Sequence, residues 1–61
     1  MPKYMLVYKT NEGKCGTLFS DDLYTIQSNK MDMECGLGWY CEVYDRVEKE
    51  DEGAEYEFWY S

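Results

Sequence analysis

Carboxylates are the side chains through which this sequence could do chemistry, and they are concentrated in its last third. Eight acids and two bases lie between residues 42 and 57, and this segment carries −6 of the formal net charge of −7. Carboxylates could act as general acids or bases, bind divalent cations, or occupy a basic surface on a partner. Each use needs its own arrangement of residues, so the spacing of the acids helps to separate the three.

Catalysis is disfavoured by what the sequence lacks. The chain has no histidine, so neither a Ser/His nor a Cys/His pair can be built. The densest acidic cluster, Glu50, Asp51 and Glu52, is typical of a flexible loop rather than of a pocket. A chain of 61 residues also seldom forms a deep pocket by itself. The sequence therefore predicts no enzyme, no catalytic residue and no cofactor.

Metal binding fits the spacing poorly. Glu48, Glu50 and Glu52 alternate as calcium ligands do. An EF-hand loop also needs a closing Glu six residues after its central glycine, and Trp59 stands at that distance from Gly53. The three cysteines show no CxxC spacing, which disfavours a zinc site. Beyond weak divalent binding at the acidic loop, no metal site is predicted.

A surface for recognition remains, and strand geometry describes it. Alternate residues of a strand lie about 6.6 Å apart on one face. Acids on two neighbouring strands are therefore expected to form a ladder of carboxylates, Glu42, Glu48, Glu55 and Glu57. Such a ladder could occupy a groove built for a sugar-phosphate backbone, with Tyr and Trp as anchors. The predicted partner-binding residues are Glu42, Tyr44, Glu48, Glu50, Asp51, Glu52, Glu55, Glu57 and Trp59.

A C-terminal hairpin must position these residues. Apolar side chains recur with a period of two at Trp39, Cys41 and Val43, as a strand with one buried face requires. We predict strands over 39–48 and 55–60, joined by an acidic loop in which Gly53 can adopt a positive φ. A helix here would scatter the apolar residues around its circumference, and β-branched and aromatic residues favour strands.

The first half of the chain predicts a second hairpin and a helix. Strands over 4–9 and 14–19 flank a turn of the sequence TNEG, and Gly16 weakens the second strand or marks a bulge. A capping segment at Ser20 begins a helical pattern over 21–35, and Gly36 and Gly38 provide stop signals. The alternative is an irregular loop with one short turn, because several residues of this segment are middling helix formers.

Together these elements predict a single α+β domain over 1–61, with the order ββαββ. One helix would lie on one face of a four-stranded, largely antiparallel sheet. The other face would carry aromatic and acidic residues with no helix to cover it. The expected core residues are Leu6, Leu18, Leu23, Ile26, Met33, Trp39, Cys41, Val43 and Phe58.

The cysteines and the lack of long apolar runs bear on the compartment. Three cysteines without a pairing pattern are expected to be buried, reduced thiols. The sequence shows no signal peptide and no apolar run near eighteen residues, so we expect a cytoplasmic protein and no membrane contact. No basic patch is available to grip phosphates, which argues against direct nucleic-acid binding.

In size and charge, this short, acidic, histidine-free and aromatic-rich sequence resembles the small proteins that phages and mobile elements encode against host defences. Anti-CRISPR proteins and DNA mimics belong to that group. The resemblance covers the whole chain but rests on composition and on the acid density of residues 42–57. It implies a non-enzymatic inhibitor that docks, in the host cytosol, on the basic surface of a nuclease or a CRISPR effector.

Two other functions stay open at this point. A homo-oligomer, for example a homodimer, could sequester a small ligand between protomers by stacking aromatic residues on it. Alternatively, the protein could be a small structural or accessory component whose acidity only confers solubility.

Overall fold

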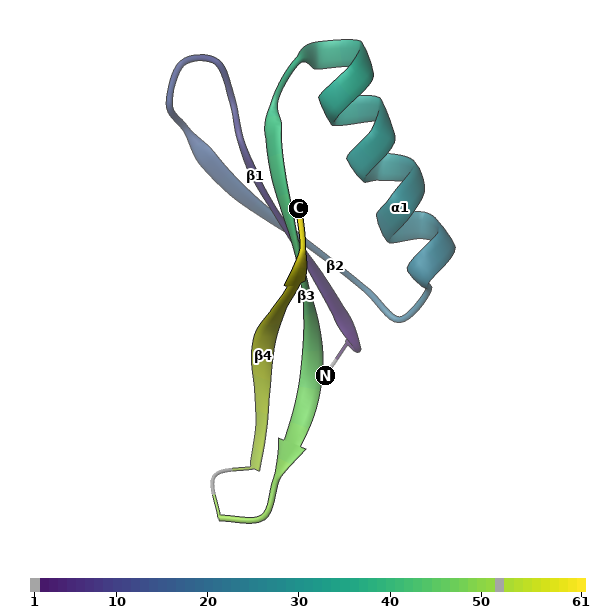
Figure 1. The fold of residues 1–61 in the computed structure, drawn as a ribbon, viewed down its shortest axis with the longest axis vertical. Helices are drawn as coiled ribbons and strands as arrows, with labels where there is room; N and C mark the ends of the chain where they lie inside the picture. The colour runs from purple at the N-terminus through teal and green to yellow at the C-terminus, as the bar shows by residue number, and fades with distance from the viewer. Residues whose placement is uncertain (1, 52) are drawn as a thin grey trace.

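The sheet of this protein is built from two hairpins that meet along their inner strands. The computed structural model describes residues 2–51 and 53–61. Its strands pair antiparallel in the order β2-β1-β3-β4, and one helical segment lies beside one face of the sheet (Figure 1). The predicted α+β fold with the order ββαββ is therefore confirmed. The elements are β1 (Tyr4–Lys9), β2 (Cys15–Ser20), α1 (Leu23–Met31), the π-helix η1 (Asp32–Leu37), β3 (Tyr40–Lys49) and β4 (Gly53–Tyr60).

The first hairpin closes through Gly13, whose φ of 86° suits glycine. Gly16 does not mark a bulge, because β1 and β2 pair without interruption. It lies opposite Tyr8, and a Cβ atom at this position would come within 2.3 Å of the Tyr8 ring. That ring stacks on Trp39, with centroids 5.6 Å apart. Glycine is therefore needed here to make room for an aromatic pair.

We expect Gly16→Ala to lower the free energy of unfolding by about 1–2 kcal/mol, because the Tyr8 ring must move off Trp39 to admit the methyl group. Urea denaturation followed by tryptophan fluorescence measures the change. Gly36→Ala is the matched control, since a Cβ there meets nothing within 4 Å. Equal midpoints for the two variants would contradict the prediction.

The helix begins two residues later than predicted and changes type before it ends. Asp22 is its N-cap, and its carboxylate accepts hydrogen bonds from the Tyr24 N–H at 3.0 Å and the Thr25 hydroxyl at 3.1 Å. The last six residues form the π-helix η1, which the sequence pattern did not predict. Gly38 ends the helix at a φ of 71°, as expected of a stop signal. No helix in the described part of the chain has the length and apolar character needed to cross a membrane.

The core is small and lies between the helical segment and the central strands β1 and β3. Leu6, Ile26, Cys41 and Val43 are fully buried. The side chains of Tyr4, Tyr8, Leu18, Met33 and Tyr60 pack against them while partly exposed. The core prediction was wrong for Phe58, which is 51% exposed. The register pairs Phe58 with Tyr44 and so places it on the face away from the helix. Leu23 and Trp39 are half-buried.

Two of the three cysteines contradict the expectation of burial. All three are free thiols, but Cys15 and Cys35 are exposed and Cys41 alone is buried. Cys15 lies on an edge strand, on the face that no helix covers, whereas Cys41 lies beneath the helical layer. Burial, reinforced by the Glu34 carboxylate, raises the pKa of the Cys41 thiol.

This difference predicts two classes of thiol. A disulfide reagent at pH 8 should modify Cys15 and Cys35 quickly and Cys41 only on unfolding. The Cys41→Ser variant should keep both fast thiols, and three fast thiols in the native protein would contradict the burial. The same burial predicts a pH dependence of stability. Because the raised pKa means that the folded state favours the neutral thiol of Cys41, this thiol contributes its full stability to the folded state at neutral pH. That contribution to the free energy of unfolding should be lost as pH rises above the ordinary thiol pKa.

Candidate functional site

The second hairpin extends beyond the rest of the sheet. β1 pairs with β3 only from Tyr40 to Asp45, and the Arg46 N–H then donates to the Lys3 carbonyl at 2.8 Å. Past this point β3 and β4 continue as a two-stranded ribbon, which points away from α1 in Figure 1. We call residues 46–51 and 53–57 the acidic arm. Of the seven acids predicted for the site, five lie in the described residues of the arm, namely Glu48, Glu50, Asp51, Glu55 and Glu57.

The expected single ladder of carboxylates is wrong. Glu57 pairs with Asp45 and Glu55 with Val47, so these side chains share one face of the hairpin. Glu42 and Glu48 lie at even positions of β3 and therefore point to the opposite face. The sequence periods were identified correctly, but the register between the strands could not be read from them. The acids consequently surround the hairpin instead of lining one side of it.

Two carboxylates of the arm are paired with bases of the arm. Lys49 Nζ lies 2.6 Å from Glu57 Oε2, and Arg46 Nη2 lies 3.6 Å from Glu48 Oε1. The hydrogen bond and the negative charge of Glu57 raise the pKa of the Lys49 ammonium. Glu50 and Asp51 lie at the tip, where they line a shallow hollow with Lys49 and Glu55. Glu52 is the one predicted site residue outside the described residues.

Aromatic side chains cover the sheet face that lies opposite the helix. Tyr44 and Phe58 lie 5.8 Å apart between ring centroids, and so do Phe19 and Tyr56. The Tyr44 hydroxyl donates to Glu42 at 3.2 Å. Desolvation and this carboxylate raise the pKa of the Tyr44 phenol. We call this surface the open sheet face. Strand alternation assigns it Met5, Val7, Lys9, Cys15, Thr17, Phe19, Tyr40, Glu42, Tyr44, Arg46, Glu48, Ala54, Tyr56 and Phe58.

Trp59 does not lie with Tyr44, although both were predicted to anchor one partner. An irregularity in the pairing of β3 with β4 falls between Val43 and Tyr44. Trp59 stacks on Tyr4 at 5.9 Å and meets the edge of Tyr60 at 5.0 Å, so it lies on the helix side of the sheet. A bulge adds one residue to one strand and changes the face to which later side chains point. Strict alternation within β4 could not have revealed it.

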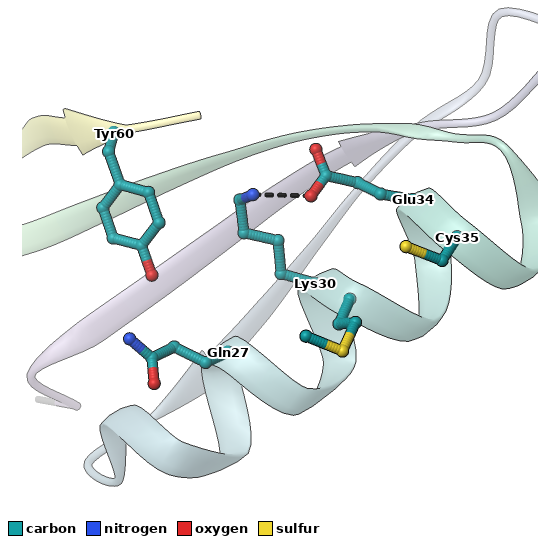
Figure 2. A pocket seen from close by; sticks show the side chains of 6 residues that line it. Gln27, Lys30, Glu34, Cys35 and Tyr60 are labelled. Carbon is teal, nitrogen blue, oxygen red and sulfur yellow. Dashed lines mark hydrogen bonds and ion pairs between the residues drawn. The ribbon is translucent and has the colours of Figure 1, made fainter.

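A groove between α1 and the end of β4 was missed by the sequence analysis. Its volume is about 340 Å³, and it is lined by Gln27, Lys30, Met31, Glu34, Cys35 and Tyr60. Figure 2 shows Lys30 paired with Glu34 and the Tyr60 ring facing the helix across the groove. The Lys30 Nζ lies 5.5 Å from the centroid of that ring. The charge of Lys30 is thus already balanced by Glu34.

Comparison with known proteins adds no relative: no family model, no curated protein and no solved structure matches this chain. Residues 2–51 and 53–61 contain no group of three acid, cysteine or histidine side chains that could hold a metal ion. The two surfaces that distinguish the molecule are therefore the acidic arm and the open sheet face.

Proposed function

We propose that this protein is a non-enzymatic interaction module whose acidic arm blocks a basic, nucleic-acid-binding surface of a host defence protein, such as a nuclease or a CRISPR effector. The observation that supports the proposal is the concentration of acids on a ribbon that extends beyond the sheet. A ribbon two strands wide can enter a groove that a flat sheet cannot.

The charges of the arm suit such a partner. Glu50 and Asp51 lie at the exposed tip, and Glu55 lies close behind them. Because Glu55 and Glu57 point to one face while Glu48 points to the other, the arm presents carboxylates on both sides. A basic partner groove would therefore meet net negative charge at the tip and along the face of Glu55 and Glu57, whereas Arg46 offsets Glu48 on the other face. Attraction between opposite charges would speed the encounter.

The test begins with a partner found by capture. The tagged protein is incubated with a nuclease-treated bacterial lysate, washed at low and then at high salt, and the bound proteins are identified by mass spectrometry. A nucleic-acid-binding protein eluted by salt is the expected result. Affinity of the purified pair is then measured by calorimetry, with the partner's nucleic acid as competitor.

The double variant Glu50→Lys/Asp51→Lys should weaken that affinity at least a hundredfold, because it places two positive charges against a basic groove. Glu12→Lys/Asp32→Lys is the matched control: it exchanges one Glu and one Asp, both exposed, and changes the net charge equally, but away from the arm. Equal losses in both variants would show that only net charge matters and would overturn the proposal. Circular dichroism confirms that each variant is folded.

A further inference from the structure

The open sheet face carries no net charge, although the chain as a whole carries −7. Its charged residues are Lys9, Arg46, Glu42 and Glu48, two of each sign. Tyr40 and Phe58 on this face are more than half exposed, and Phe19 is half exposed. Exposed aromatic surface without net charge is typical of a protein interface. A second copy of this acidic chain could approach here without repulsion between the facing surfaces.

The four charges are also placed symmetrically about the pair formed by Met5 and Tyr44. Glu42 and Arg46 lie two residues before and two residues after Tyr44 on β3. Glu48 lies four residues beyond Tyr44 in one direction. Because β1 runs antiparallel to β3, Lys9 lies four residues from Met5 in the opposite direction.

Two symmetric ways of stacking this face on itself exist, and charge distinguishes them. With the two-fold axis parallel to the strands, each acid would face the same acid of the other copy, and both acidic arms would lie at one end. With the axis perpendicular to the strands, Glu42 meets the partner's Arg46 and Glu48 meets the partner's Lys9 at the same level. The arms then lie at opposite ends. Like charges directly opposite are destabilising, so the second arrangement is favoured.

We propose that the open sheet face binds a second copy of this chain in a symmetric dimer whose facing strands run antiparallel. The two sheets stack about 10 Å apart, as packed sheets do. Phe58 and Tyr44 form the apolar centre, and Glu48 lies beside the partner's Lys9. Arg46 and Glu48 at the base of each acidic arm lie in this interface, but Glu50 and Asp51 at the tip stay outside it, so the dimer leaves the tip free for the function proposed above.

Sedimentation equilibrium over a range of concentrations tests the dimer directly. Lys9→Glu and Glu48→Lys should each weaken it about tenfold, because each single change replaces two attractive contacts per dimer by repulsive ones. The double variant Lys9→Glu/Glu48→Lys should restore the wild-type dissociation constant. Both side chains are exposed, that of Glu48 by 75%. Within one protomer these two side chains cannot meet. Lys9 pairs with Tyr40, and Tyr40 lies eight residues, or about 26 Å, from Glu48 along β3. Rescue must therefore act between protomers.

A second variant tests the apolar centre. Phe58→Ser should weaken the dimer about thirtyfold or more, as truncation of a central aromatic residue does. Tyr24→Ser removes an aromatic residue that is 76% exposed on the helix and should leave the dimer unchanged. If the wild-type protein stays monomeric at about 500 µM, the proposal is overturned. A dimer that tolerates Phe58→Ser, or a double charge variant without rescue, would also overturn it.

Discussion

Leu6→Ala is expected to lower the free energy of unfolding by about 2–5 kcal/mol, the largest effect of any single truncation in this chain. Leu6 is fully buried at the centre of β1, where it pairs with Leu18 on one side and Val43 on the other. Because the core contains four fully buried residues, few neighbouring side chains can move in to fill the cavity that the truncation leaves. A domain of this size has a total stability of only about 3–9 kcal/mol, so the variant should be largely unfolded at 37 °C.

Thermal unfolding followed by circular dichroism measures this effect. Leu37→Ala is the matched control, because it removes the same atoms from a side chain that is 53% exposed at the end of η1. It should change the free energy of unfolding by less than about 0.5 kcal/mol. Similar melting temperatures for the two variants would show that the small core does not determine the stability.

Tyr60→Ala is expected to lower the free energy of unfolding by about 2–3 kcal/mol, the second-largest effect after Leu6→Ala. The ring packs against the buried core from the end of β4 and meets the edge of Trp59. It faces Lys30 across the groove (Figure 2). Its removal would widen the groove beside α1 and take away a ring that packs against the core. Tyr24→Ala, at an exposed site, serves as the control.

The hydroxyl of the same residue should behave in the opposite way. The Tyr60 Oη is buried and has no hydrogen-bond partner among the described residues. Tyr60→Phe removes that oxygen and keeps the ring, so the free energy of unfolding should stay constant or rise by up to about 1 kcal/mol. Denaturant titration of Tyr60→Phe and Tyr60→Ala side by side checks both expectations. A clear loss in Tyr60→Phe would indicate that the hydroxyl is bound after all.

The elements of this fold could be predicted because each rests on local signals. Turn residues such as Gly13 and Gly38 and the alternation through Cys41 and Val43 placed every strand within about two residues. The π-helical end of the helix could not be predicted. It depends on hydrogen bonds between residues five apart, such as that from the Gly38 N–H to the Met33 carbonyl, which the spacing of apolar residues does not encode.

The candidate site was predictable in composition but not in arrangement. The concentration of acids in one hairpin is visible in the sequence, and the structure extends the far end of that hairpin beyond the rest of the sheet. Which acids share a face depends on register, and Glu55 pairs with Val47 instead of joining Glu48. The irregular pairing in β4 placed Trp59 on the helix side. Both features arise from pairing between strands, which a single sequence specifies only indirectly.

The strand order has a consequence for how this chain reaches its native state. Each hairpin joins neighbours in sequence, but the seam between β1 and β3 joins Tyr4 to Asp45 and Lys9 to Tyr40. Closing a loop of about 30–40 residues carries an entropic cost that no local contact repays. The core forms only across this seam, since Leu6 and Val43 lie on its two sides. The docking of the two hairpins, which are joined in sequence by the helical segment, should therefore limit the folding rate.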